Sequence, residues 1–135
     1  MKILLIEDSR LLRITTERTL VRAGYEVITA VDGEEGLRLA VESKPDLVLL
    51  DMMLPKLSGQ EVLQKLRLNP AAKSTPVIVL TGLSQANRQK LLDEGASLYF
   101  EKSLVDVDNG SRLLLDAIQT LLARGSKAKA ASRTS

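Results

Sequence analysis

Four aliphatic residues lead directly into a single carboxylate in the stretch Leu47-Val-Leu-Leu-Asp51. An unbroken aliphatic run of this length is typical of a strand covered on both faces, as the central strands of a parallel sheet are. The stretch therefore predicts a buried parallel strand that ends in an acidic side chain.

Four further segments have the composition of strands, and segments with helical periodicity separate them. The predicted strands are Ile3–Ile6, Glu26–Ala30, Leu47–Leu50, Val77–Leu80 and Leu98–Phe100. The predicted helices are Arg10–Ala23, Glu34–Ser43, Gly59–Leu68, Gln85–Glu94 and Arg112–Ala123. This alternation favours an α/β fold, a doubly wound five-stranded parallel sheet flanked by five helices. Ser58-Gly-Gln-Glu61 predicts a capping box at the start of the third helix.

The composition limits the chemistry that the chain can support. Histidine and cysteine are both absent, which removes disulfides, thiol nucleophiles and the usual ligands of transition metals. Any bound metal is therefore expected to be an oxygen-seeking ion such as Mg²⁺.

Length and charge indicate one folded domain followed by a short basic end. We expect the domain over residues 1–123 and a flexible tail or linker stub over residues 124–135. The tail carries four bases and no acid, so removing its charge from the formal +2 leaves residues 1–123 at −2. Because the folded part is not basic, we expect no direct contact with nucleic acid. No apolar run is long enough for a membrane span and no signal-peptide pattern is present, so the expected location is cytoplasmic.

Reactive side chains follow four of the predicted strands at their carboxyl ends. Glu7 and Asp8 follow the first strand, Asp51 the third, Thr81 and Gly82 the fourth, and Lys102 the fifth. Ligands of doubly wound sheets bind beyond these ends. Three carboxylates that meet there would repel one another, and a partly hydrated Mg²⁺ would offset the repulsion.

Each of these residues also has a simpler explanation. An Asp or Thr directly after a strand is often the N-cap of the next helix, and a lone lysine is usually a solvated surface residue. Their joint occurrence at four strand ends on one side of the sheet favours a functional site.

The motifs resemble those of the receiver domains of two-component signalling, over residues 1–123. Ile3-Leu-Leu-Ile-Glu-Asp8 is similar to the first strand and acidic pair of that family. Leu47-Val-Leu-Leu-Asp51-Met-Met-Leu-Pro55 is similar to its phosphoacceptor strand and the proline that follows. Thr81 and Tyr99-Phe-Glu-Lys102 match its switch hydroxyl, switch aromatic residue and lysine. The resemblance implies a CheY-like, flavodoxin-like fold with strand order 2-1-3-4-5.

The resemblance also implies roles for individual residues. Asp51 would accept a phosphoryl group from a histidine kinase or a histidine phosphotransfer protein. The implied Mg²⁺ ligands are Asp8, Asp51, Glu7 through water, and the backbone carbonyl of Met53. Phosphoryl binding and switching would involve Thr81, Gly82, Lys102 and Tyr99. The chain would be a signalling phosphoacceptor that promotes its own phosphorylation and dephosphorylation, and not an enzyme. It would be either a monomer or a weak phosphorylation-dependent dimer. Its output partner would bind the face of the fourth helix, fifth strand and fifth helix.

The first predicted helix offers a docking surface for the kinase. Leu12, Thr16, Thr19, Leu20 and Ala23 have the spacing of a core stripe. Leu11 and Ile14 fall outside this stripe and are expected to face solvent beside the acidic site. We therefore expect Leu11, Leu12 and Ile14 to lie in the docking surface.

Two other functions share part of this pattern. A phosphohydrolase of the haloacid-dehalogenase type needs a second aspartate two residues after the first, where this chain has Met53. A pseudo-receiver would be expected to lack the aspartate, an acidic residue or the lysine, and none is missing.

The family usually has a proline after the lysine; Ser103 stands there instead, so we expect a trans Lys102–Ser103 bond. The sequence leaves open whether the receiver acts alone, as a phosphorelay intermediate, or as part of a longer protein.

Overall fold

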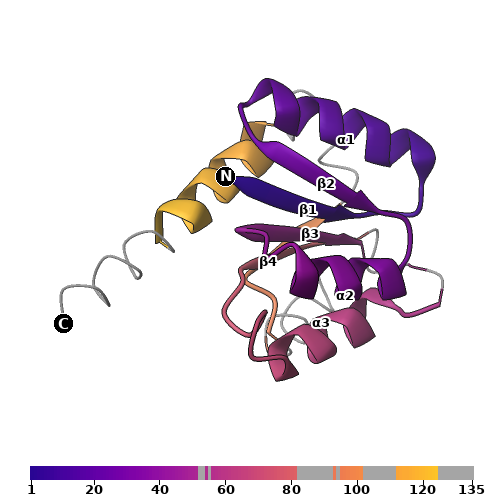
Figure 1. Ribbon diagram of the computed structural model, residues 1–135. Coiled ribbons are helices and arrows are strands. Elements are labelled where there is room, and N and C mark those ends of the chain that lie inside the picture. Colours follow the sequence, from indigo (N-terminus) through magenta and orange to yellow (C-terminus); the bar gives the residue numbers. More distant parts are fainter. Residues whose placement is uncertain (52–53, 55, 82–92, 94, 102–111, 125–135) are drawn as a thin grey trace, which may run out of the picture.

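A computed structural model describes residues 1–51, 54, 56–81, 93, 95–101 and 112–124 of the 135 (Figure 1). For Thr81, Tyr99, Phe100 and Glu101 it describes the backbone alone. The predicted fourth helix apart from Asp93, the Lys102–Ser103 bond, and residues 125–135 of the predicted tail lie outside the described residues.

A five-stranded parallel sheet forms the centre of the molecule. Its strands are β1 (Lys2–Ile6), β2 (Glu26–Ala30), β3 (Leu47–Asp51), β4 (Val77–Thr81) and β5 (Leu98–Glu101). They pair in the order β2-β1-β3-β4-β5, which confirms the predicted doubly wound topology. The aliphatic residues of β1 and β3 are all buried, and Lys2 at the start of β1 is half-buried. This burial is expected for strands with helices on both faces.

Helices cover both faces of the sheet. The labelled helices are α1 (Arg10–Arg22), α2 (Gly33–Glu42) and α3 (Gly59–Leu68), and a further helix spans residues 112–124. α2 and α3 lie on one face, while α1 and the helix of residues 112–124 lie on the other (Figure 1). The four described helices match predicted ones to within one residue at each end.

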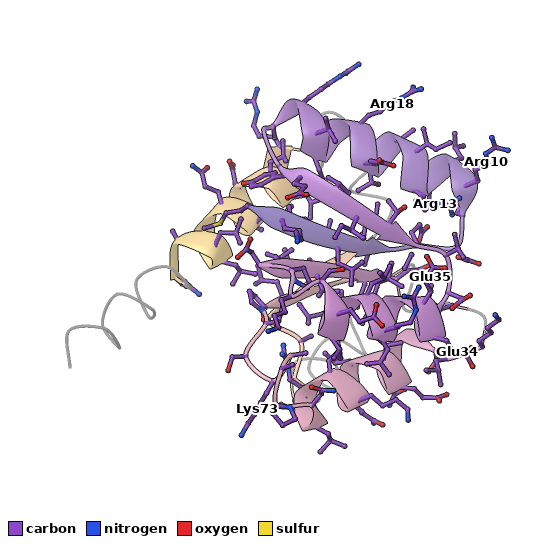
Figure 2. All side chains as sticks on the ribbon, viewed as in Figure 1. Arg10, Arg13, Arg18, Glu34, Glu35 and Lys73 are labelled. Carbon is purple, nitrogen blue, oxygen red and sulfur yellow. The ribbon has the colours of Figure 1, made fainter. Side chains whose placement is uncertain are left out.

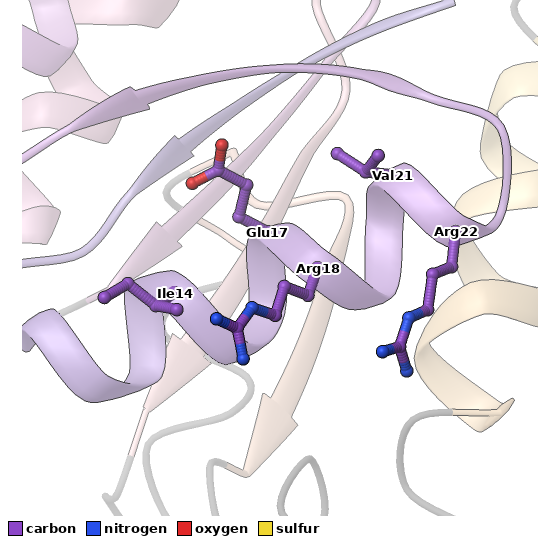
Figure 3. A pocket seen from close by; sticks show the side chains of 5 residues that line it. All are labelled: Ile14, Glu17, Arg18, Val21 and Arg22. Atoms are coloured by element: carbon purple, nitrogen blue, oxygen red, sulfur yellow. The ribbon is translucent and has the colours of Figure 1, made fainter.

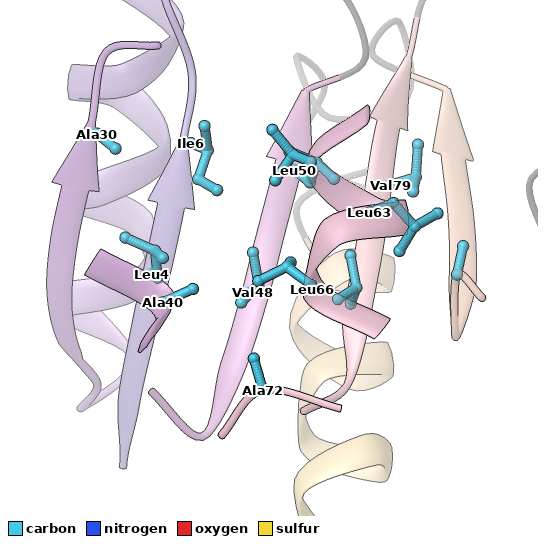
Figure 4. Packing of buried hydrophobic residues seen from close by; sticks show 13 residues of the cluster. Leu4, Ile6, Ala30, Ala40, Val48, Leu50, Leu63, Leu66, Ala72 and Val79 are labelled. Carbon is cyan, nitrogen blue, oxygen red and sulfur yellow. The ribbon is translucent and has the colours of Figure 1, made fainter. Parts of the chain in front are cut away.

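The alternation of side chains along the strands divides the core in two. Leu4, Ile6, Val48 and Leu50 point toward α2 and α3 and pack against Leu63 and its neighbours (Figure 4). The residues between them, Ile3, Leu5, Leu47 and Leu49, pack against Leu20 of α1 and against Leu114 and Ile118. Successive strand residues point to opposite faces, so Glu7 and Asp51 continue the series that faces α1.

Local caps fix the ends of the helices. The N-cap half of the predicted capping box is confirmed, because the Ser58 hydroxyl accepts a hydrogen bond from the Glu61 amide at 3.2 Å. The Glu61 carboxylate lies 3.4 Å from the same hydroxyl. Ser9 caps α1, and Asp32 caps α2. The assignment of Ala23 to the core stripe of α1 is wrong: the helix ends at Arg22, and Ala23 is an exposed C-cap.

Candidate functional site

Three carboxylates meet at the carboxyl edge of the sheet. Glu7 and Asp8 directly follow β1, and Asp51 is the last residue of β3. One carboxylate oxygen from each lies within 4.8 Å of those of the other two. Asp51 is 0% exposed and Glu7 3% exposed, whereas Asp8 is exposed. The structure thus brings together the three acids that the sequence predicted.

The strand register explains this meeting. Ile6 pairs with Leu50 in the parallel ladder between β1 and β3, so Glu7 and Asp51 each stand one residue further along neighbouring strands. Adjacent strands lie about 4.8 Å apart, which brings both carboxylates to one side of the sheet. The amide of Glu7 donates to the carbonyl of Ala30 at 3.0 Å, which continues the pairing with β2 as far as the acidic residue.

The donor set fits a small, hard divalent cation. Two oxygens bound to one Mg²⁺ lie at most about 4.2 Å apart, twice a metal–oxygen bond of about 2.1 Å. The observed spacing of 4.8 Å or less is therefore close to that of a shared ion, and small rotations of the side chains would close the difference. Carboxylate oxygens are ligands that Mg²⁺ and Ca²⁺ prefer. The cluster could thus hold a metal ion.

The segment after Asp51 is tied to the start of α2. Lys56 has a positive φ of 67°, and its ammonium lies 3.5 Å from the carboxylate of Asp32. Asp32 accepts a hydrogen bond from the Glu35 amide at 2.8 Å. That bond, helped by the charge of Lys56, holds the pKa of the Asp32 carboxyl below its ordinary value of 3.8, against a smaller effect of burial.

Gly33 allows the same two segments to approach closely. A Cβ atom at Gly33 would lie 2.6 Å from the Leu57 Cβ and would clash with the Leu57 carbonyl oxygen. A side chain at this position would therefore push apart the start of α2 and the segment before α3. Sequence reasoning missed Asp32, Gly33 and Lys56, although the Asp-Gly pair before a helical segment is a recognisable cap signal.

The other predicted site residues are placed only in part. Thr81 is the last residue of β4, one residue beyond Leu80, which pairs with Asp51. Tyr99 lies in β5 and pairs with Val79. Met53, Gly82 and Lys102 lie outside the described residues.

The outer surface of α1 carries both apolar and basic side chains. Leu11 is 72% exposed, as predicted, while Leu12 and Ile14 are half-buried. Ile14 is therefore less exposed than expected, and it lines an open groove together with Glu17, Arg18, Val21 and Arg22 (Figure 3). Within the described part of the chain, no helix is both long enough and apolar enough to cross a membrane.

Comparison with known proteins identifies the family. Residues 3–114 match the response regulator receiver domain family, and the chain belongs to this family. It is 37% identical over 135 residues to the DNA-binding dual master transcriptional regulator RpaA of Synechocystis, covering 99% of this chain and 54% of RpaA. It is 42% identical over 102 residues to the alkaline phosphatase synthesis transcriptional regulatory protein PhoP of Bacillus subtilis, covering 75% of this chain and 42% of PhoP.

A solved structure agrees with this assignment. The fold superposes on the chemotaxis response regulator of Vibrio cholerae with a TM-score of 0.78 at 31% identity, covering 89% of this chain and 97% of that one. The resemblance drawn from the sequence motifs is thus confirmed at the level of family and fold. The chain spans about half the length of the two curated regulators that it matches.

Proposed function

We propose that Asp51 is the phosphoacceptor of this receiver domain. The observation that carries the proposal is the position of Asp51: a fully buried carboxylate at the end of β3, with the carboxylates of Glu7 and Asp8 within 4.8 Å. The phosphorus–nitrogen bond of a phosphohistidine donor breaks and a phosphorus–oxygen bond to the Asp51 carboxylate forms. The electron pair of the broken bond stays on the imidazole, and the product is an acyl phosphate.

Mg²⁺ is the cation that we assign to the acidic cluster. Asp8 and Asp51 would bind it directly, Glu7 through water, and the Met53 carbonyl would complete the protein ligands. When bound, the ion neutralises negative charge on the transferring phosphoryl group. The residues of the chain contribute mainly by holding the nucleophile and the cation ligands in place, which is where most of the rate of phosphoryl transfer originates.

The switch and partner assignments belong to the same proposal. Thr81, Gly82 and Lys102 would contact the phosphoryl oxygens. Tyr99 would change position when these contacts form, and so alter the output face of β5 and its neighbouring helices. A ligand shifts such an equilibrium only by binding one conformation better than the other. The donor would be a histidine kinase or a histidine phosphotransfer protein docked on α1 near Leu11, Leu12 and Ile14.

Phosphorylation by a small donor tests the proposal without knowledge of the kinase. Acetyl phosphate with Mg²⁺ should add one hydroxylamine-sensitive phosphoryl group to the wild-type chain. EDTA should prevent the reaction, and Asp51→Asn should abolish it because an amide is not a competent nucleophile here. Full labelling of Asp51→Asn would contradict the assignment of Asp51 as the phosphoacceptor.

A further inference from the structure

Arg13 of α1 is bonded to the backbone of the acidic pair. Its Nη1 atom donates to the carbonyl oxygen of Glu7 at 3.0 Å and lies 3.3 Å from that of Asp8. The side chain is half-buried and lies at the end of α1 nearest the carboxyl ends of the strands (Figure 2). One guanidinium nitrogen thus serves two consecutive peptide groups in the segment that joins β1 to α1.

These bonds hold the backbone of Glu7 from a second side. Its amide already donates to Ala30 at 3.0 Å, so the residue is held on one side by β2 and on the other by α1. The other side chain that bonds within this junction makes a longer contact, since the Ser9 hydroxyl accepts from the Leu12 amide at 3.4 Å, near the limit for a hydrogen bond. Of these two side chains, Arg13 makes the shorter bond.

The orientation of these two peptide groups sets the direction of the two carboxylates. We propose that Arg13 is a positioning residue for the divalent cation: it holds the Glu7–Asp8 backbone so that both side chains face Asp51. The inference rests on the proposed function, in which these carboxylates bind Mg²⁺. Groups that orient metal ligands through hydrogen bonds commonly change metal affinity when they are removed.

Charge and geometry predict opposite effects for the loss of Arg13. A guanidinium is always positive in proteins, so by charge alone its removal would strengthen the binding of a cation. Loss of its hydrogen bonds would instead free the Glu7–Asp8 segment and weaken binding. The sign of the change in affinity therefore separates the two effects.

Titration with Mn²⁺, a spectroscopic substitute for Mg²⁺, measures that sign. Free Mn²⁺ is followed by electron paramagnetic resonance for the wild type, Arg13→Met and the matched control Arg18→Met. Arg18 is an exposed arginine on the same helix (Figure 2), and its replacement removes the same charge without touching the acidic pair. We expect Arg13→Met to bind Mn²⁺ about threefold to tenfold more weakly than Arg18→Met. Equal or tighter binding by Arg13→Met overturns the inference.

Asp8→Asn distinguishes failure of this inference from failure of the proposed function. If Asp8→Asn binds Mn²⁺ as well as the wild type does, the acidic cluster is not the cation site. The proposed Mg²⁺-dependent function is then contradicted. If Asp8→Asn weakens binding and Arg13→Met matches its control, the site stands and only the positioning role is wrong.

A second variant keeps the test decisive if Arg13→Met does not unfold cooperatively in EDTA. Arg13→Lys retains the charge but has a shorter reach and one donor atom, so only the geometry of the bonds changes. We expect about twofold to threefold weaker Mn²⁺ binding. Amide hydrogen exchange of residues 8–12 should be faster in Arg13→Lys, while exchange in β3 should be unchanged. Wild-type affinity together with wild-type exchange contradicts the inference.

Discussion

Arg67 donates two hydrogen bonds to one oxygen atom, the carbonyl oxygen of Gly95, from Nε at 2.9 Å and from Nη2 at 2.8 Å. Its third nitrogen, Nη1, donates to the carbonyl of Thr75 at 2.7 Å and to that of Lys73 at 3.0 Å. The last turn of α3 is thereby joined to the segments that precede β4 and β5. Partial burial lowers the pKa of the Arg67 guanidinium, which nevertheless stays charged at neutral pH.

We predict that Arg67→Met lowers the free energy of unfolding by about 2–4 kcal/mol, because several partly buried carbonyls lose a charged donor at once. Urea denaturation measures this change. Lys65→Met removes the same charge from an exposed position in the same turn and should change stability by less than about 0.5 kcal/mol. Equal effects of the two substitutions would show that the carbonyl contacts contribute nothing beyond charge.

The acidic cluster should destabilise the metal-free protein. Two unit charges within 4.8 Å of each other repel by about 1 kcal/mol or more, even in a medium as polar as water. We therefore expect Asp8→Asn to raise the free energy of unfolding in EDTA by about 1–2 kcal/mol, and to remove most of the stabilisation that Mg²⁺ gives the wild type. Chemical denaturation with and without Mg²⁺ checks both parts. The exposed Asp116 offers a control: Asp116→Asn should leave the response to Mg²⁺ unchanged.

Asp8 and Glu7 should contribute unequally to the binding of the cation. Asp8 is assigned as a direct ligand and Glu7 as a ligand through water, so Asp8→Ala should weaken Mn²⁺ binding more than Glu7→Ala. Isothermal titration of both variants gives the ratio of the two affinities. A larger loss of Mn²⁺ affinity for Glu7→Ala would show that Glu7 is the direct ligand and that Asp8 binds through water.

The charge of Asp32 should make stability depend on pH. Its folded pKa lies below its ordinary value of 3.8, so the ionised form is favoured by folding. This stabilisation is fully present above the unfolded pKa and is lost as pH falls through the folded one. Asp32→Asn keeps a good N-cap residue and removes only the charge. We expect the variant to be less stable than the wild type from pH 7 to about pH 5, and the difference to narrow below about pH 4. If the difference in the free energy of unfolding stays constant down to the lowest pH measured, the charge of Asp32 does not contribute to stability.

Leu11 should matter for a protein donor and not for a small one. It is 72% exposed on α1, and an exposed apolar side chain beside the acidic site suits a protein contact. Leu11→Ala should slow transfer from the cognate histidine donor by about fivefold or more while leaving the rate with acetyl phosphate unchanged. Leu68→Ala, at an 83% exposed position on α3, should change neither rate. Equal slowing with both donors would indicate damage to the site and not to docking.

The features predicted correctly from the sequence have short-range signatures. Aliphatic runs give the buried strands, and the parallel topology then fixes which residues follow their carboxyl ends. The proximity of Glu7, Asp8 and Asp51 therefore follows from the sequence alone. The N-cap bond between Ser58 and Glu61 is equally local.

The missed features depend on contacts between distant parts of the chain. Arg67 reaches Gly95, which is 28 residues away, by bonding to a backbone carbonyl, and no side-chain pattern marks such a partner. The contact of Asp32 with Lys56 and the close approach allowed by Gly33 likewise depend on how two loops lie against each other. Ala23 was misplaced for a different reason: periodicity extends a stripe past the residue where the helix ends, since the pattern contains no information on the cap geometry.

The central claim is that the phosphoryl group is carried by Asp51, and chemical mapping tests it most directly. Borohydride reduces an aspartyl phosphate to homoserine and leaves unmodified carboxylates unchanged. Peptide mass spectrometry of wild-type protein treated with acetyl phosphate and Mg²⁺, and then with borohydride, locates the reduced residue. We predict homoserine at position 51 alone, in an amount that falls to background when EDTA replaces Mg²⁺. Homoserine at position 8, or at any aspartate other than Asp51, would contradict the account.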